Sequence, residues 1–172
     1  IDNTNIHGID MESLSKNNAI TLPIFTENFK SIINNYYGYN SIVYIIAHNN
    51  FNYDQLVLEN NFKKINVQFD LNIIFVDSLL LIRHLIPELY QYNLKALAKR
   101  IISNTQDIMF HTAIDDAKIL AQIIRNIFNA NIYLFNNFDA FIRSFSRPLL
   151  TSKHILNCSL DKIPGLYNLN DI

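Results

Sequence analysis

The sequence has a single cysteine, Cys158, which excludes any disulfide bond within the chain and fits a reducing compartment. It also lacks long apolar runs: the longest, such as Ile42 to Ala47, are far shorter than the roughly 20 residues that a membrane-spanning helix needs. The first residues are polar, without the basic start and apolar stretch of a signal peptide. These absences predict an intracellular protein of the cytoplasm or nucleus that is neither secreted nor membrane-bound.

An excess of positive charge is lacking as well. The chain has 14 Lys and Arg residues against 15 Asp and Glu residues, and its formal net charge is -1. Proteins that bind nucleic acid through bulk electrostatic attraction are usually basic. Any nucleic-acid contact is therefore expected to be local, with bound metal supplying much of the positive charge.

Hydrophobic residues make up 49% of the 172 residues, enough for the core of one domain.

Helical patterns alternate with short apolar strands along the chain. The two β-branched runs, Ile42 to Ala47 and Ile73 to Asp77, have the continuous apolar character of strands that are buried on both faces. Apolar spacing and capping residues predict helices from a cap at Thr26 to Tyr36, from Asp54 to Phe62, from Ser78 to Leu85, from a cap at Asn93 to Ile101, and from Ala113 to Phe128. This alternation indicates an α/β layered fold.

The ends of the chain have weaker patterns. Residues 1–22 are polar and irregular, and the aromatic-rich residues 132–145 stay ambiguous between helix and strand. A domain spanning residues 1–147 is expected, followed by a C-terminal extension over residues 148–172 that contains a Pro164-Gly165 turn. One apolar stripe is expected to form the buried face of the helix from Ala113, and it consists of Ala117, Leu120, Ala121, Ile124 and Phe128.

Polar residues directly follow the first strand, in the segment His48-Asn49-Asn50-Phe51-Asn52-Tyr53-Asp54. Ligands of α/β sheets bind at the carboxyl ends of the strands, and a carboxylate placed there can bind a hard cation such as Mg²⁺. Asp54 alone would more often be a helix N-cap. Its position after a buried strand and after His48-Asn49 favours the role of a ligand.

A second candidate segment opens the longest predicted helix and reads His111-Thr112-Ala113-Ile114-Asp115-Asp116-Ala117. If the helix begins near Thr112, Asp116 lies about a turn and a half into it, and His111 can lie over a metal that Asp116 binds. A histidine of near-neutral pKa beside a metal-bound water is a suitable general base. Asp115 is expected to face solvent, and Asp77 to cap the helix from Ser78.

These segments resemble two motifs of the DnaQ-like, DEDDh-type 3′→5′ exonucleases. The second motif, in its TREX-type form H-N-x-x-x-(F/Y)-D-x-x-x-L, matches His48 to Leu58, and the third, H-x-A-x-x-D-A, matches His111 to Ala117 throughout. Two weaker matches fall in order: Ile6-His7-Gly8-Ile9 is similar to the family's I-H-G-I segment, and Val76-Asp77-Ser78-Leu79 to its D-T-L strand end. The resemblance covers about Ile1 to Phe128.

The resemblance implies an RNase H-like three-layer α/β fold, with a mixed central sheet flanked by helices. It implies a metal-dependent exonuclease that hydrolyses phosphodiester bonds at single-stranded DNA or RNA 3′ ends, with two Mg²⁺ or Mn²⁺ ions. In that case Asp54 and Asp116 would bind metal, and His111 would be the general base. His48, Asn49 and His7 would border the substrate.

The family's first motif, an Asp-x-Glu pair on an N-terminal strand, has no convincing match. Asp10-Met11-Glu12 has the right letters but follows the His7-Gly8 turn rather than an apolar strand, so it is expected on a surface turn. We therefore expect the N-terminal strands to be missing and the pair to lie upstream of Ile1. Two alternatives stay open: a catalytically inactive RNase H-like module that binds nucleic acid or a partner protein, and a nuclease domain of a larger polymerase or replication assembly.

Overall fold

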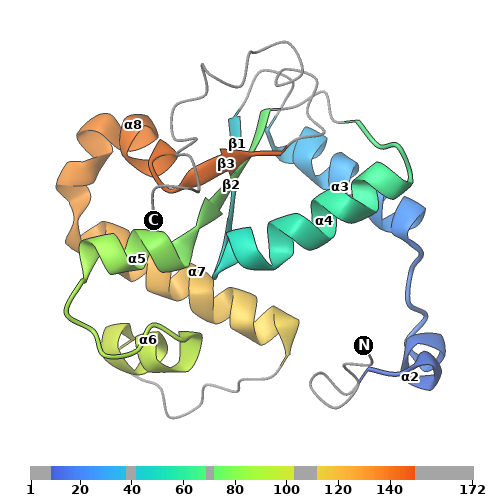
Figure 1. Cartoon of the computed structure of the whole chain (residues 1–172), viewed down its shortest axis with the longest axis horizontal. Helices are drawn as coiled ribbons and strands as arrows, with labels where there is room; N and C mark the ends of the chain where they lie inside the picture. Colours follow the sequence, from blue (N-terminus) through green and yellow to red (C-terminus); the bar gives the residue numbers. More distant parts are fainter. Residues whose placement is uncertain (1–8, 38–41, 69–71, 103–111, 150–172) are drawn as a thin grey trace.

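A mixed three-stranded sheet lies at the centre of the computed structural model, which describes residues 9–37, 42–68, 72–102 and 112–149 (Figure 1). Strand β1 (Ile42–Ala47) runs parallel to β2 (Asn72–Asp77), and β2 pairs antiparallel with β3 (Ser146–Pro148). The register places Ala47 opposite Asp77, so β1 and β2 end at the same edge of the sheet. The predicted α/β fold with a mixed sheet is confirmed.

Helices account for most of the other described residues. The α-helices are α2 (Met11–Lys16), α3 (Leu22–Tyr37), α4 (Asp54–Lys64), α5 (Ser78–Leu85), α6 (Leu94–Ile101), α7 (Ala113–Ala130) and α8 (Phe138–Arg143). Two 3-10 helices accompany them, η1 (Asn50–Asn52) and η2 (Ile132–Asn137). Helices α4, α5, α6 and α7 begin where the sequence predicts. No helix among the described residues combines the length and apolarity needed to cross a bilayer.

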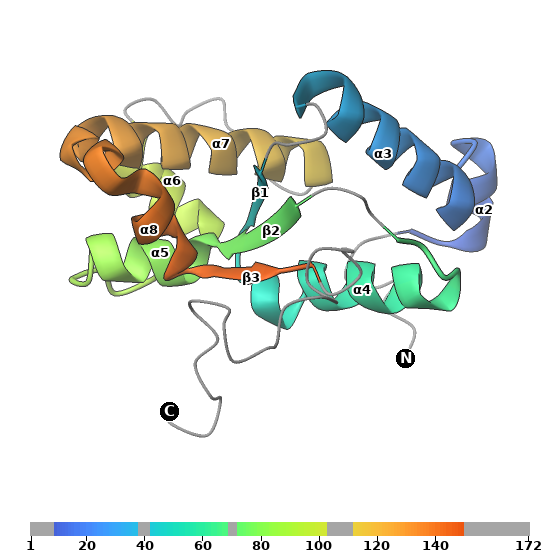
Figure 2. The ribbon, with the colours of Figure 1, turned by 90° about the horizontal axis from the view of Figure 1, so that it is seen from above.

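The two faces of the sheet support two hydrophobic clusters, because successive side chains of a strand point to opposite faces. On one face, Val43, Ile73 and Phe75 pack with Ile33 of α3 and Phe62 of α4. The other face packs against side chains of α5, α6, α7 and α8. Both ribbon views place α3 and α4 on one side of the strands and α5, α6 and α8 on the other (Figures 1 and 2). The result is a three-layer arrangement.

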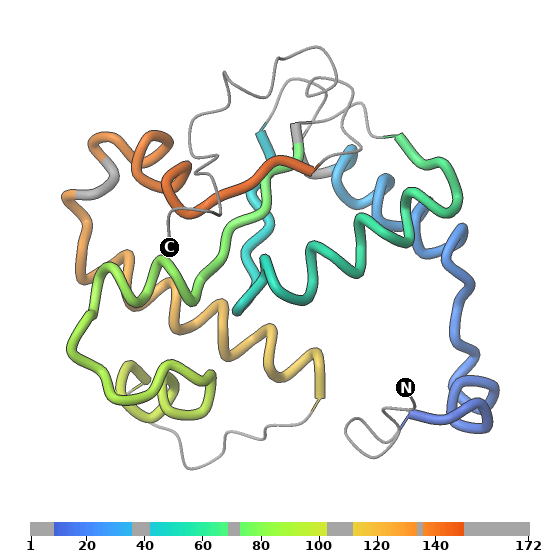
Figure 3. The backbone as a smooth tube through the Cα atoms, viewed as in Figure 1, coloured from blue at the N-terminus to red at the C-terminus, as the bar shows by residue number. Residues whose placement is uncertain are grey.

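Along the chain, helix α4 connects the parallel strands β1 and β2, as the tube trace shows (Figure 3). Strand β1 forms one edge of the described sheet, and its side chains are mostly half-buried, with Ile42 exposed and Val43 buried. Burial on both faces is therefore confirmed for β2, where Ile73, Phe75 and Val76 are buried, and only partly for β1.

Helix α3 begins earlier than predicted, at Leu22 rather than after a cap at Thr26. Thr26 lies inside the helix, is 1% exposed, and donates its hydroxyl proton to the Leu22 carbonyl at 2.8 Å. This bond to the preceding turn is a common alternative to capping for threonine. The predicted cap is wrong because Pro23 fits the first helical turn, where its missing N–H costs no hydrogen bond.

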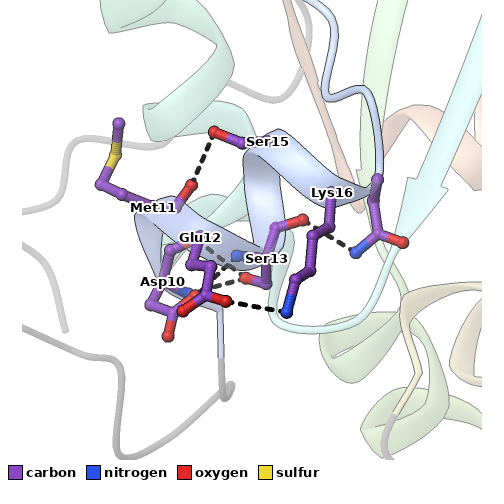
Figure 4. A network of polar contacts seen from close by, with 7 residues as sticks. Asp10, Met11, Glu12, Ser13, Ser15 and Lys16 are labelled. Carbon is purple, nitrogen blue, oxygen red and sulfur yellow. Dashed lines mark hydrogen bonds and ion pairs between the residues drawn. The ribbon is translucent and has the colours of Figure 1, made fainter.

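The N-terminal residues include a short helix, α2, where the sequence predicts irregular structure. The Asp10 carboxylate accepts a hydrogen bond from the Ser13 amide at 2.7 Å, and the Ser13 hydroxyl oxygen accepts one from the Asp10 amide at 2.9 Å (Figure 4). This capping box holds the pKa of Asp10 below its ordinary value. Glu12 pairs with Lys16 at 2.7 Å. Asp10 and Glu12 are thus exposed as predicted, but Asp10 caps a helix and Glu12 lies within it, rather than both lying on a turn.

The aromatic-rich stretch is helical, forming η2 and α8, and leads into β3. Strand β3 has no counterpart in the prediction. Leu149, just after it, is fully buried against Phe75 and other residues of the α3–α4 side, and its amide donates to the Ile73 carbonyl at 3.0 Å. Residues 146–149 therefore belong to the sheet and its core. From residue 150 onward, the expected extension lies outside the described residues.

Candidate functional site

A cavity of about 800 Å³ lies between β1, the turn after it and α7. Asp54, Asp116 and His48 all line this cavity. Asp54 is the first residue of α4, Asp116 lies in the first turn of α7, and His48 directly follows β1. Two separate sequence segments thus bring their polar side chains to one place, at the carboxyl end of β1.

The rest of the cavity wall is largely apolar and includes Tyr44, Ile46, Leu94, Ala117, Leu120 and Ile124. Arg125 is the basic residue among the lining side chains. Ala117 and Ala121, which the sequence places on the buried face of α7, are exposed to this cavity. The core face of α7 consists of Ile119, Ile123 and Ile127 together with Leu120 and Ile124, the two members of the predicted stripe that are buried. Helical periodicity alone does not separate a stripe that faces a cavity from one that faces the core.

The cap of α7 distinguishes the two neighbouring aspartates. The Asp115 amide donates to the Thr112 hydroxyl at 3.1 Å, and that hydroxyl donates to the Asp115 carboxylate at 2.6 Å. Lys118 lies 3.8 Å from the same carboxylate. Asp116 is half-buried, and its side chain lines the cavity. The cap therefore uses the carboxylate of Asp115 and leaves that of Asp116 to the cavity.

The charged form of Asp54 is disfavoured by its surroundings. Asp54 is exposed overall, yet partial loss of water around its carboxylate raises its pKa; a hydrogen bond to its own backbone opposes the rise, and the negative charge of Asp77 adds to it. A bound cation would remove this penalty. Carboxylate oxygens also suit a hard divalent ion, so Asp54 and Asp116 fit part of a metal site. Within the described ranges, no three His, Cys, Asp or Glu side chains form a group that could hold an ion.

His48 uses both ring nitrogens within the protein. Its Nδ1 lies 3.0 Å from the Ser78 hydroxyl oxygen, and its Nε2 lies 2.7 Å from the Tyr92 carbonyl oxygen. Burial lowers the pKa of His48. Asn49 has a left-handed backbone conformation with φ of 58°, which asparagine tolerates better than most residues. The Asn49 side-chain oxygen accepts a hydrogen bond from Asn52 at 2.7 Å.

Asn50, a residue that sequence reasoning missed, holds the turn between β1 and α4. It is fully buried, donates to the Val76 carbonyl at 3.1 Å, and accepts from the Gln55 amide at 3.1 Å. Asp77 caps α5 as predicted, accepting from the Leu79 amide at 2.9 Å, and it also accepts from the Phe51 amide at 3.2 Å. The available signal for Asn50 was a short polar side chain in the polar segment that follows the predicted strand from Ile42 to Ala47.

Two predicted site residues, His7 and His111, lie outside the described residues. The structure does describe Thr112, the residue after His111, which caps α7. The proposed role of each histidine therefore rests on the sequence motifs.

Comparison with known families supplies one match. A family model described as an exonuclease, of the RNase T type, matches residues 2–124. The matched range contains Asp54, Asp116 and His48, together with β1, β2 and most of α7. A comparison with curated proteins finds no match.

Proposed function

The chain belongs to this exonuclease family, and from that premise we propose that it is a metal-dependent 3′→5′ exonuclease of the DEDDh class. Its substrates would be the 3′ ends of single-stranded DNA or RNA, whose terminal phosphodiester bonds it hydrolyses. The observation that carries the proposal is that Asp54 and Asp116, from two separate motifs, line one cavity with His48. The cavity lies at the carboxyl end of β1, where ligands of α/β sheets bind.

The roles of the residues follow from their chemistry. Asp54 and Asp116 would hold divalent cations, Mg²⁺ or Mn²⁺, with two ions expected. When bound, the cations would lower the pKa of the attacking water and neutralise negative charge at the phosphodiester. His111, one residue before the Thr112 cap, would accept the proton of that water. The single cysteine, Cys158, supports an intracellular setting for this reaction.

Two aspartates are too few for two ions, because hard cations take about six oxygen ligands. We propose that an Asp-x-Glu pair comes from a strand N-terminal to Ile1, which pairs with the outer edge of β1. In the described sheet, β1 has β2 as its partner on one side and lies at the end of the strand order. Tyr44 and Ile46 of β1 line the cavity, so a strand added at that edge would bring its side chains next to Asp54 and Asp116.

A direct test is the divalent-metal-dependent degradation of oligonucleotides by the full-length protein. Parallel substrates labelled at the 3′ or 5′ end report the direction, and matched DNA and RNA strands report the sugar preference. Asp116→Asn is expected to lower the rate by about 100-fold or more, because a metal ligand contributes several kcal/mol to the transition state. Asp115→Asn, one residue away, is the matched control and should keep most of the activity. Equal rates for the two variants would refute the assignment.

A second candidate function is a catalytically inactive RNase H-like module that binds nucleic acid or a partner protein. The observation in its favour is that the described residues contain no group of three potential metal ligands. Calorimetry with Mn²⁺ separates the two functions. The exonuclease proposal expects binding that Asp54→Asn and Asp116→Asn each weaken, whereas an inactive module would give the same titration in all three proteins.

A further inference from the structure

Three segments that are distant in the sequence meet at the imidazole ring of His48. The ring extends from the end of β1, and its Nδ1 lies 3.0 Å from the hydroxyl oxygen of Ser78, the first residue of α5. Its Nε2 lies 2.7 Å from the carbonyl oxygen of Tyr92, in the connection between α5 and α6. Tyr92 is itself held, because its hydroxyl donates to the Ile86 carbonyl at 2.8 Å and the Arg83 guanidinium lies 5.3 Å from its ring centre.

These partners determine where the ring carries its proton. A backbone carbonyl can only accept a hydrogen bond, so the Nε2 of His48 must be the donor toward Tyr92. Burial lowers the pKa of His48 and outweighs the Tyr92 carbonyl and the carboxylates of Asp77 and Asp54, which favour the charged ring, while Arg83 acts in the same direction as burial. A neutral ring that is protonated on Nε2 has a bare Nδ1. That nitrogen therefore accepts the hydroxyl proton of Ser78.

The same turn has two further anchors on the end of β2. The Asn50 side chain donates to the Val76 carbonyl at 3.1 Å, and the Phe51 amide donates to the Asp77 carboxylate at 3.2 Å. These two hydrogen bonds and the contact between His48 and Ser78 thus hold the turn over residues 48–53 against residues 76–78. Asp54 follows this turn directly, so its position in the cavity depends on these bonds.

We infer that His48 is a positioning residue whose neutral, Nε2-protonated ring fixes both the turn that carries Asp54 and the connection before α6. This rests on the proposed nuclease function. Both polar atoms of the ring are occupied by Ser78 and Tyr92, so none is left to bind a substrate. The connection that His48 holds leads to Leu94, which lines the same cavity. The ring therefore positions two neighbouring parts of the wall of the cavity that His48 also lines.

Kinetics of His48→Gln and Ser78→Ala test the inference in the full-length protein. Groups that orient a metal ligand typically change activity by about 10- to 100-fold when they are removed, so we expect His48→Gln to lower kcat by that factor with KM nearly unchanged. Ser78→Ala, which keeps the Tyr92 bond, should give a smaller drop in the same parameter. His84→Gln is the matched control, because His84 is exposed and lies outside the cavity lining. A raised KM with normal kcat would overturn the inference in favour of substrate contact.

Nitrogen NMR of the imidazole gives a readout that does not depend on activity. The expected spectrum of His48 at neutral pH has one protonated nitrogen, Nε2, and one unprotonated nitrogen, Nδ1, and Ser78→Ala should shift the Nδ1 signal. An Nδ1-protonated ring would overturn the inference. A wild-type protein without nuclease activity in Mg²⁺ or Mn²⁺ would refute the proposed function instead, whereas an active wild type with unchanged kcat in both variants would refute the positioning role alone.

Discussion

Replacing Asn50 by alanine should destabilise the fold more than the replacement of an asparagine in an exposed turn would. The side chain is fully buried and joins three segments: it follows β1, donates to the carbonyl of Val76 in β2, and accepts from the amide of Gln55 in α4. Alanine removes both bonds and leaves two buried backbone groups without these partners. The change therefore affects the connection between the sheet and the helix that begins with Asp54.

The size of the effect follows from those two bonds. A buried polar group that loses its partner costs about 1–3 kcal/mol, and water entering from the nearby cavity would reduce the penalty. We expect Asn50→Ala to lower the free energy of unfolding by about 2–4 kcal/mol. For a domain of this size each kcal/mol corresponds to about 2–4 °C, so Tm should fall by roughly 5–15 °C.

Urea denaturation followed by circular dichroism measures the loss, with thermal unfolding as a second reading. Asn52→Ala is the matched control, because Asn52 is exposed and its side chain bonds only Asn49 among the described residues. Exposed substitutions of this kind usually change stability by less than about 0.5 kcal/mol. If Asn50→Ala and Asn52→Ala cost the same within that margin, the reasoning about the buried turn is wrong.

Two further changes test the electrostatics and the core. Because the pKa of Asp54 is raised in the folded protein, its ionisation destabilises the fold at neutral pH, and that penalty vanishes as the pH falls below the ordinary pKa of aspartate. Asp54→Asn should therefore raise Tm at neutral pH without metal but not in acid. Melting curves recorded in a chelator over a pH series measure this, and a lower Tm of the variant at neutral pH would contradict it. Leu149→Ala removes a fully buried side chain and should lower the free energy of unfolding by about 2–5 kcal/mol in urea denaturation, whereas a loss below about 1 kcal/mol would mean that Leu149 is not part of the core.

The helix starts were predictable where the signal is local. Asp77 and Asn93 are short polar residues before apolar helical patterns, and both cap their helices through bonds to amides two or three residues later. Thr26 gave the same signal and was wrong, because a threonine hydroxyl bonds equally well to the carbonyl of the preceding helical turn. The sequence alone does not distinguish these two uses of one hydroxyl.

Strand β3 was not predictable, because only three residues form it and they have no periodic pattern. Its pairing, in which Phe75 lies opposite Arg147, joins segments that are distant along the chain. In the site, too, local motifs were predictable from the sequence and contacts between distant segments were not. Motif spacing pointed to Asp54 and Asp116, and both line the cavity. The contact between His48 and the Tyr92 carbonyl depends on how the connection before α6 folds back, and no spacing rule encodes that path.

The outer edge of β1 has a practical consequence for handling the protein. The strand Ile42–Ala47 ends the strand order of the described sheet, and its sequence Ile-Val-Tyr-Ile-Ile-Ala has neither charge nor proline. Charges and prolines are the devices that normally keep an open strand edge from pairing with other chains. A preparation in which no strand covers this edge would thus be prone to join molecule to molecule through β1. Solubility at rising protein concentration is then a sensitive indicator of whether the sheet is complete.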